Sequence, residues 1–286
     1  MNSFAIDLGS LFHPSSVKRV VGGVGALLCL TVGAGCSMKS MIYPAPAVQV
    51  GDPPASFEEV GLRLDDGTGV VGWHRPGSER DDRPVMIFFH GNGENLETMK
   101  GSDLYERLAA LGVPLLVVDY PGYGRSTGQP SEESLKSAAT AALKWAGELY
   151  PNRAVVPCGW SLGAALAIHL AATRPTEIEG VVAISPWISL PEVAKAHFPG
   201  WLVAMGLREE YDSLQAAPRV SSPALVIHGA ADSIIPMDQG ETVAASLQSA
   251  RWVPVEGAGH NNLLSFAVVW QEIDSFVTGL RAPVGV

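Results

Sequence analysis

The chain has 286 residues, of which 47% are hydrophobic and 17% charged, so it is long and apolar enough to bury a large core. This composition excludes general disorder. The 19 basic residues are outnumbered by 29 acidic ones and form no cluster, which argues against a nucleic-acid-binding protein. Cys29, Cys36 and Cys158 match neither a disulfide framework nor a set of metal ligands, so we expect no metal site.

Residues 1–36 are predicted to be a leader. A basic pair precedes an uncharged segment, residues 20–35, which is shorter than the ~20 residues of a membrane span and is typical of a secretory signal. The junction Gly33-Ala34-Gly35-Cys36 resembles the lipobox of bacterial lipoproteins, although Gly33 stands where that family has Leu. The resemblance implies an acylated Cys36 and an extracytoplasmic, membrane-anchored protein, and Ser37 fits sorting to the outer membrane. The alternative is an uncleaved membrane anchor.

Residues 37–56 contain several prolines among small side chains and are predicted to be a semi-rigid spacer or an early loop. From residue 57 to residue 286, apolar runs alternate with amphipathic helical patterns. We predict helices at residues 131–150 and 238–250. Strands are predicted at residues 59–64, 70–74, 85–89, 115–119, 155–160, 181–184, 225–228 and 251–255.

Near-continuous apolar strands that alternate with helices are typical of strands buried on both faces. The pattern therefore predicts an α/β fold with a mostly parallel central sheet of about eight strands and helices on both faces. The first two strands flank Asp65-Asp66-Gly67-Thr68-Gly69 and are expected to form an antiparallel hairpin at one edge. In such sheets, function collects at the carboxyl ends of the strands. Polar clusters follow the predicted strands at residues 90–93, 119–126, 161, 185–187, 228–232 and 257–261.

The residues Gly159-Trp160-Ser161-Leu162-Gly163 lie between a predicted strand and the Ala-rich helical stretch 164–173. A serine in a tight strand-to-helix turn, flanked by glycines two positions away, is the arrangement called a nucleophile elbow. The pattern of five letters alone also arises by chance. In this strand–turn–helix setting it is a working hypothesis of serine hydrolase chemistry with Ser161 as the nucleophile.

A serine nucleophile needs a base, and the base needs an acid that orients it. With the elbow, these follow in the order Ser, Asp or Glu, His. His260, in a Gly-rich loop after the last strand, is the chosen base, whereas His228 is expected to be structural. Asp232 is the chosen acid, and Asp238, at the start of a predicted helix, is the runner-up.

Charge on the substrate oxygen needs hydrogen-bond donors placed in advance. The backbone N–H groups of Asn92 and Leu162 are the expected oxyanion hole, one after His90-Gly91 and the other after the nucleophile. A simple tight turn is the alternative reading of residues 90–93.

Five motifs occur in order: an HGN turn at His90, a DYPGYGxS segment at Asp119, GxSLG around Ser161, an HGxxD loop ending at Asp232, and GxxHN ending at Asn261. Together they resemble the α/β-hydrolase superfamily, and within it the Bem46-like or ABHD13-like branch. The resemblance implies the α/β-hydrolase fold and a serine hydrolase that acts on esters or thioesters without a cofactor. A small-molecule or lipid-like ester is then the expected substrate.

Residues 187–217 are predicted to be a short cap insertion, with an ordinary crossover helix as the alternative. If the segment is a cap, Trp187, Phe198 and Trp201 are candidates for an acyl pocket. Two other functions stay open: a serine peptidase of the prolyl-oligopeptidase type, and a non-catalytic surface lipoprotein that keeps the hydrolase fold.

Overall fold

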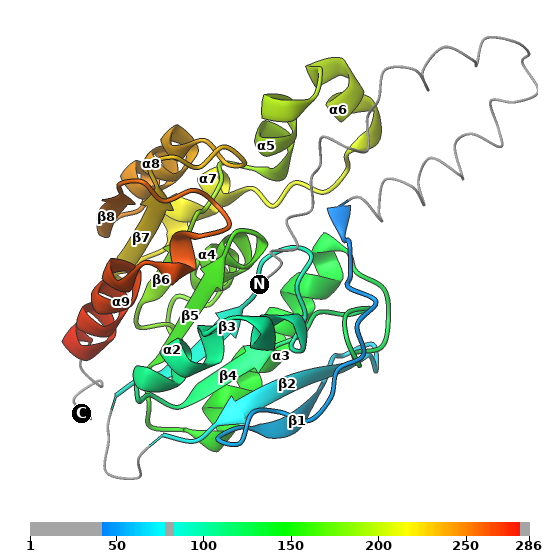
Figure 1. Ribbon diagram of the computed structural model, residues 1–286, viewed down its shortest axis with the longest axis vertical. Helices are drawn as coiled ribbons and strands as arrows, with labels where there is room; N and C mark the ends of the chain where they lie inside the picture. Colours follow the sequence, from blue (N-terminus) through cyan, green and yellow to red (C-terminus); the bar gives the residue numbers. More distant parts are fainter. Residues whose placement is uncertain (1–41, 78–82, 281–286) are drawn as a thin grey trace, which may run out of the picture.

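The computed structural model describes residues 42–77 and 83–280. The predicted leader and Cys36 lie outside these residues. The described chain forms one eight-stranded sheet in the order β1-β2-β4-β3-β5-β6-β7-β8 (Figure 1). The strands are β1 (Glu58–Arg63), β2 (Gly69–Arg75), β3 (Val85–Phe89), β4 (Leu115–Val118), β5 (Val155–Trp160), β6 (Val181–Ile184), β7 (Ala224–Gly229) and β8 (Ala250–Val255).

The eight predicted strands are confirmed, with ends that differ from the prediction by at most one residue. The pairing is antiparallel between β1 and β2 and between β2 and β4, and parallel across the rest of the sheet. The predicted hairpin at one edge is therefore confirmed. β3, β5, β6 and β7 are parallel and buried along their whole length, which explains their unbroken apolar sequences.

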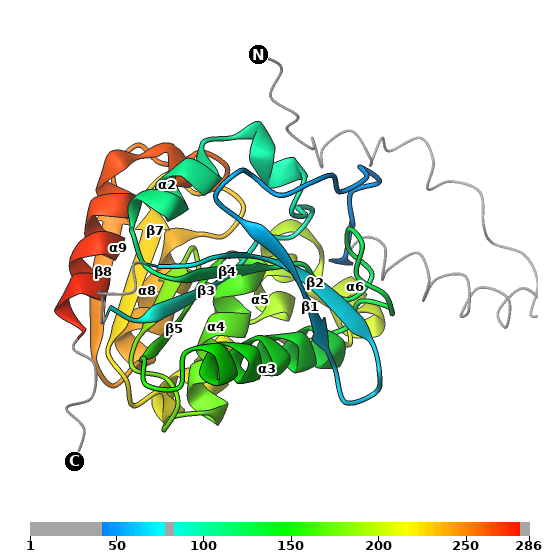
Figure 2. The same cartoon turned by 90° about the horizontal axis from the view of Figure 1, so that it is seen from below.

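Helices cover both faces of the sheet, as Figure 2 shows for α2 and α9 on one side and α3 and α4 on the other. Alternate residues of β3 point to the two cores: Val85, Ile87 and Phe89 to one, Met86 and Phe88 to the other. The α-helices are α2 (Leu104–Ala110), α3 (Glu132–Leu149), α4 (Leu162–Thr173), α5 (Leu190–His197), α6 (Gly200–Gly206), α7 (Ser213–Ala216), α8 (Met237–Ser246) and α9 (Ala267–Gly279). Short 3-10 turns are η3 (Thr98–Gly101), η4 (Ala217–Arg219) and η5 (Leu263–Ser265).

The predicted helix at residues 131–150 is confirmed as α3, which runs from Glu132 to Leu149. It begins at Ser131, whose hydroxyl accepts a hydrogen bond from the backbone N–H of Ser134 at 3.1 Å while the Ser134 hydroxyl bonds back to the Ser131 N–H. This capping box satisfies donors that a helix start leaves free, which typically stabilises a helix by about 1 kcal/mol.

The predicted helix at residues 238–250 is too long at its end. α8 stops at Ser246, because Ala250 pairs with Ala224 as the first residue of β8 and the Ser249 carbonyl accepts the Ala224 N–H. Pairing with a strand distant in sequence thus overrides a local helical pattern.

The order of the strands places the site. The chain leaves β3 and passes to β4 on one side, whereas β5 lies on the other side of β3. An α/β sheet has its binding crevice at such a reversal, outside the carboxyl ends of the strands. The two segments at this point are the turn after β3, which contains Asn92, and the turn after β5, which contains Ser161.

Candidate active site

Ser161 occupies a strained turn between β5 and α4. Its φ of 57° is in the left-handed region, which costs a non-glycine residue roughly 1–3 kcal/mol unless the surroundings enforce it. Here the backbone N–H of Ser161 donates to the carbonyl of Ile184 in β6, and its carbonyl accepts from Ala164. Both flanking glycines are obligatory: a Cβ on Gly159 would lie 2.0 Å from the Gly163 oxygen, and one on Gly163 would lie 2.0 Å from the Phe89 oxygen.

His260 bridges Ser161 and Asp232. Its Nε2 lies 3.1 Å from Ser161 Oγ, and its Nδ1 lies 2.7 Å from Asp232 Oδ2. All three side chains are buried, and they come from the loops after β5, β7 and β8. With Nδ1–H donating to the carboxylate, Nε2 is left to accept the proton of the serine hydroxyl. The structure thus brings together the three residues that the sequence analysis selected.

The carboxylate of Asp232 is held by several donors. Its Oδ1 accepts the backbone N–H groups of Ile234 and Ile235 at 2.9 Å and 2.8 Å. Burial alone would raise the pKa of Asp232, but hydrogen bonds from His228, His260 and the Ile235 backbone outweigh it and keep the pKa well below its ordinary range. Asp232 is therefore ionised at neutral pH and fixes the orientation of the His260 imidazole.

Two competing residues have structural positions. His228 Nε2 lies 2.9 Å from the carbonyl oxygen of Ile235 and 3.4 Å from Asp232, so this histidine supports the loop that carries the acid. Asp238 lies in the first turn of α8, where a negative charge is favoured by the helix dipole.

The two predicted oxyanion donors flank the contact between β3 and α4. Leu162 is the first residue of α4, so its N–H has no acceptor within the helix. Within the part of the chain that the structure describes, the backbone N–H of Asn92 also has no acceptor. Gly163 packs directly on the carbonyls of Phe89 and His90, which brings the start of α4 against the turn that contains Asn92.

The side chain of Asn92 is held by a hydrogen bond at each end of its amide group. Its Nδ2 donates to the carbonyl of Ile42 at 2.5 Å, and its Oδ1 accepts from the Tyr123 hydroxyl at 3.1 Å. The Gly91 N–H donates to Glu94 Oε2 at 3.1 Å, and the pKa of Glu94 is raised because burial disfavours its charged form. These supporting residues were not among those predicted from the sequence. The DYPGYGxS motif contains Tyr123 and was the available signal.

The segment before β1 is packed against the domain. The Tyr43 hydroxyl lies 2.8 Å from the Tyr211 hydroxyl in a buried contact, and the Val48 carbonyl accepts from Asn95 Nδ2 at 3.2 Å. We call residues 42–57 the strap; it follows the side of the molecule toward β1 (Figure 1). From Ile42 on, the predicted spacer is thus an ordered early loop that touches the turn after β3.

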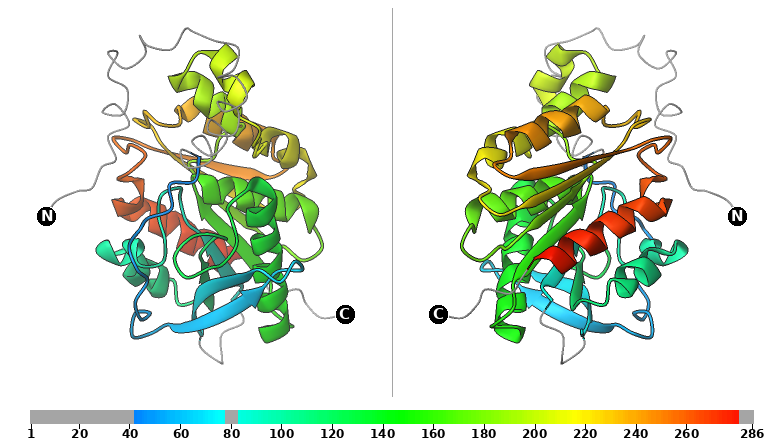
Figure 3. Two further views of the ribbon diagram at one scale, coloured as in Figure 1. Left: turned by 90° about the vertical axis from the view of Figure 1, so that its right-hand side faces the viewer. Right: turned by 90° about the vertical axis from the view of Figure 1, so that its left-hand side faces the viewer.

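The insertion after β6 contains α5 and α6, which stand out from one end of the molecule (Figure 3). It is not a single crossover helix. The three residues predicted to line an acyl pocket have different surroundings: Trp187 is 4% exposed and packs in the core, with its Nε1 donating to the Tyr211 carbonyl. Trp201 is 67% exposed on the outside of α6. Phe198 is half-buried at the end of α5. The two tryptophans differ because Trp187 lies three positions after the end of the buried strand β6, whereas Trp201 lies in a helix with one buried residue.

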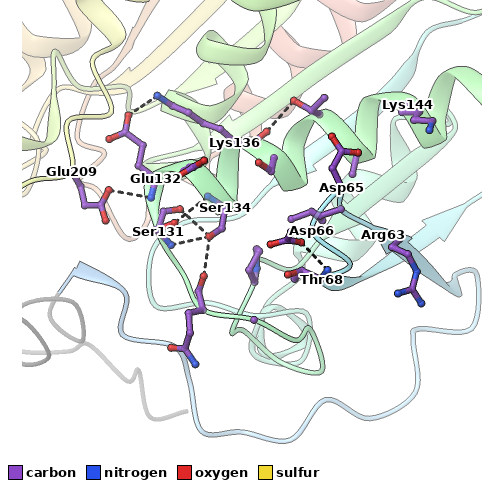
Figure 4. A pocket seen from close by; sticks show the side chains of 18 residues that line it. Arg63, Asp65, Asp66, Thr68, Ser131, Glu132, Ser134, Lys136, Lys144 and Glu209 are labelled. Atoms are coloured by element: carbon purple, nitrogen blue, oxygen red, sulfur yellow. Dashed lines mark hydrogen bonds and ion pairs between the residues drawn. The ribbon is translucent and has the colours of Figure 1, made fainter.

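A cavity of about 310 Å³ opens at His260 and is lined by Ser233, Ile234, Gly259, His260, Asn261 and Asn262. A larger cavity of about 1150 Å³ lies between the turn of the β1–β2 hairpin and α3 (Figure 4). None of Ser161, Asp232 and His260 lines it. Its polar groups are partly paired with one another, since Lys136 Nζ forms an ion pair with Glu132 Oε1 and the backbone N–H of Glu132 donates to Glu209 Oε2. Of the three candidate catalytic residues, the smaller cavity touches His260, whereas Ser161 and Asp232 do not line it.

Cys158 is buried in β5, and burial raises the pKa of its thiol, which keeps it protonated and unreactive. Among the described residues, no group of three or more His, Cys, Asp or Glu side chains has the arrangement of a metal site. Within residues 42–77 and 83–280, no helix combines the length and apolar composition needed to cross a bilayer.

Two family models match the chain. One, described as alpha/beta hydrolase fold, matches residues 84–205, and the other, described as TAP-like protein, matches residues 200–285. An uncharacterized protein of Mycobacterium tuberculosis is 35% identical over 226 residues, which cover 77% of this chain and 79% of that protein. Protein bem46 of Schizosaccharomyces pombe is 27% identical over 216 residues, covering 70% of this chain and 72% of bem46.

The lysophosphatidylserine lipase ABHD12 of Danio rerio is 27% identical over 180 residues, covering 57% of this chain and 47% of the lipase. The matched region thus spans about half of that lipase. Among solved structures, the esterase Pf2001 of Pyrococcus furiosus superposes with a TM-score of 0.66 at 19% identity, covering 82% of this chain and 98% of the esterase. At this identity the superposition shows a common fold.

Proposed function

Because the chain belongs to the alpha/beta hydrolase fold family, in its Bem46-like group, we propose that it is a serine hydrolase that cleaves carboxylic esters or thioesters. The observation that carries the proposal is one hydrogen-bonded chain: Ser161 Oγ to His260 Nε2 at 3.1 Å, and His260 Nδ1 to Asp232 Oδ2 at 2.7 Å. An alcohol with a base in reach, and a base oriented by an ionised acid, is the arrangement that activates a serine nucleophile.

In the proposed reaction, Ser161 Oγ attacks the acyl carbonyl carbon while its proton passes to His260 Nε2. The negative oxygen of the tetrahedral intermediate accepts the N–H groups of Asn92 and Leu162, each of which is expected to contribute about 3 kcal/mol. His260 then protonates the leaving alcohol or thiol as its bond to carbon breaks. A water molecule then attacks the acyl carbon and gives its proton to His260. His260 passes this proton to Ser161 Oγ as the bond from Oγ to the acyl carbon breaks, which releases the acid and restores Ser161 and His260.

The names of related proteins support an ester as the substrate. The matched relative ABHD12 is a lysophosphatidylserine lipase, and the superposed Pf2001 is an esterase. The cavity of about 310 Å³ beside His260 is of a size that admits a small acyl group. We place esters and thioesters ahead of amides for these reasons.

We further propose that the protein is held outside the cytoplasm by a lipid on Cys36, which lies in the sequence Gly33-Ala34-Gly35-Cys36. Diacylation and N-acylation of such a cysteine would supply more than one chain, which stable anchoring requires. Cells that express the protein and are fed radiolabelled palmitate should label it, and Cys36→Ala should remove the label. Label that survives this substitution would reject the anchor.

A set of nitrophenyl esters with increasing acyl length tests the activity. Purified protein should hydrolyse members of this set and leave aminoacyl nitroanilides intact, whereas a serine peptidase would cleave the anilides. Ser161→Ala should lower kcat by about 10⁴-fold or more. Ser137→Ala is the matched control, because Ser137 lines the larger cavity and is exposed on α3. Equal activity of Ser161→Ala and wild type would reject the proposed nucleophile.

A further inference from the structure

The outer side of α6 carries three large apolar side chains that face solvent. Trp201 is 67% exposed, Leu202 42% and Met205 79%. Residues separated by four positions share one face of a helix, so Trp201 and Met205 lie next to each other. We call these three residues the apolar cap face. The other exposed large apolar side chains of the described residues are scattered over different elements: Val48, Leu149, Leu214 and Val268. Scattered residues of this kind are ordinary, whereas a cluster indicates a binding surface.

The apolar cap face has no partner within the described chain that would bury it. α5 buries none of its residues and α6 buries only Val203. The two helices pack against each other and project beyond the sheet and its covering helices (Figures 1 and 3). An apolar helix face normally packs on a core, so this one is available to an external surface.

The described chain starts at the foot of this cap. Tyr43 bonds to Tyr211, which follows the end of α6 at Gly206 by five positions. Cys36 precedes Ile42 by six positions. Tyr43 is seven positions from Cys36. Even a fully extended chain spans at most roughly 3.6 Å per residue, so a lipid on Cys36 would hold the foot of the cap within about 25 Å of the membrane surface. Because α6 is only about 10 Å long, its outer side also lies close to the foot of the cap.

We propose that the apolar cap face docks onto the surface of the phospholipid bilayer, with Trp201 and Met205 among the headgroups. This inference rests on the membrane anchoring proposed above. Tryptophan is favoured at membrane interfaces because one end of its ring is apolar and the other donates a hydrogen bond. The protein has a net charge of −10, so apolar burial rather than attraction to anionic lipid must drive docking. Neutral phosphatidylcholine is therefore the expected lipid, with little dependence on salt.

The docked cap would place lipid next to the cavity beside His260. His197 at the end of α5 donates from Nε2 to the Ile234 carbonyl at 2.8 Å. Ile234 lines the cavity beside His260, and its N–H donates to Asp232. The cap is thus joined directly to the loop that carries the acid. The substrate class that follows is an ester lipid that partitions into the bilayer and enters the cavity from it.

Quenching of Trp201 fluorescence tests the docking. The full-length protein is reconstituted in phosphatidylcholine vesicles whose acyl chains are brominated near the headgroup, and lipidation is checked by palmitate labelling. The emission of Trp201 is obtained by subtracting the fluorescence of Trp201→Phe from that of the wild-type protein. We expect most of this emission to be lost in brominated vesicles, and the emission difference for Trp252→Phe, on β8, to be unaffected.

A lipidated protein whose Trp201 is not quenched would overturn the docking and leave the anchor intact. An unlipidated protein whose Trp201 is quenched when vesicles are added would support the docking and reject the anchor. If Trp201 is not quenched and no lipid is attached, both proposals fall. The nitrophenyl ester assay on Ser161 reports hydrolase function separately.

A second readout is the ratio of two rates: hydrolysis of a long-chain ester embedded in vesicles, divided by hydrolysis of a short soluble ester. The double variant Trp201→Ser, Met205→Ser should lower this ratio about tenfold, because the loss of apolar burial weakens docking. Leu149→Ser, which removes an exposed apolar residue at the end of α3, should leave the ratio at the wild-type value. An unchanged ratio in the double variant would overturn the proposal.

Discussion

The candidate active site and the cap helices α5 and α6 differ in how firmly the surrounding structure holds them. Ser161, Asp232 and His260 are buried and come from loops at the ends of β5, β7 and β8, where packed glycines and backbone hydrogen bonds fix the chain. α5 and α6 bury one residue between them. Catalysis depends on sub-ångström placement and therefore needs buried, hydrogen-bonded residues, whereas binding to a surface tolerates helices with few buried contacts.

After the nucleophile itself, the largest expected effect is at the acid. Asp232→Asn should lower kcat by about 10⁴-fold, roughly 5.5 kcal/mol of transition-state stabilisation, because the amide cannot hold the same His260 tautomer. Asp238→Asn is the matched control, since Asp238 lies in the first turn of α8. It should keep kcat within about twofold and change stability by less than about 1 kcal/mol. Steady-state kinetics that show Asp238→Asn as the more impaired variant would contradict the choice of acid.

Two glycine substitutions contrast the regions directly. Gly163→Ala should destabilise the protein by more than about 3 kcal/mol, because the new Cβ would collide with the Phe89 carbonyl at the end of β3. Gly200→Ala, at the start of α6, meets no atom within 4 Å and should be neutral or stabilise by up to about 1 kcal/mol. Chemical denaturation of both variants measures the difference. Similar midpoints for the two would show that the elbow is not packed as described.

Loss of the hydrogen bonds that hold the Asn92 side chain should have an intermediate effect. Asn92→Ala keeps the backbone N–H but removes the bonds to the Ile42 carbonyl and the Tyr123 hydroxyl. A loosened donor should lower kcat about tenfold to a hundredfold with little change in KM. Tyr123→Phe, which breaks one of the two bonds, should give a smaller decrease in the same direction. A change confined to KM would assign Asn92 to ground-state binding instead.

The smallest expected effect is the contribution of His169, on α4, to the pH dependence of folding stability. Burial, with a further contribution from the charge of Lys136, lowers the pKa of His169 on α4 to about 4. Between its unfolded pKa of about 6.5 and this value, the unfolded chain binds more protons, so stability that is present above pH 6.5 is lost as the pH falls toward 4. Glu132 and Arg219 also face this histidine and act in opposite directions.

Urea unfolding of wild type and His169→Gln from pH 7.5 to 4.5 measures this contribution, and the variant should show the smaller loss of stability. Parallel pH profiles for the two proteins would contradict the assignment. Asp232 adds a separate loss at lower pH, because its pKa is depressed in the folded state and its contribution disappears as that carboxylate is protonated.

Much of the rigid region could be predicted from the sequence, because its signals are local. Apolar runs located all eight strands, and the order of Ser161, Asp232 and His260 along the chain selected the residues that the structure brings together. The identity of the acid followed from its place after a strand, which Asp238 lacks.

The rest depends on contacts between distant residues that no periodicity encodes. The strap is held by the contact of Tyr43 with Tyr211, 168 positions away, whereas its prolines left a semi-rigid spacer and an early loop equally open. Trp187 and Trp201 are the same type of residue in the same insertion, but Trp187 packs in the core and Trp201 faces solvent. The projection of the cap helices away from the sheet explains this difference, and it cannot be read from the sequence. The early end of α8 is set by the pairing of Ala250 with Ala224.

Covalent labelling with a fluorophosphonate tests the central claim most directly, because this reagent reacts only with a serine that its own site has activated. Folded protein should gain a single adduct, and peptide mapping should place it on Ser161. His260→Ala should slow labelling by about 10²-fold or more. Folded wild-type protein that gains no adduct, or carries it on another residue, would contradict the assignment of Ser161, His260 and Asp232 as one catalytic unit.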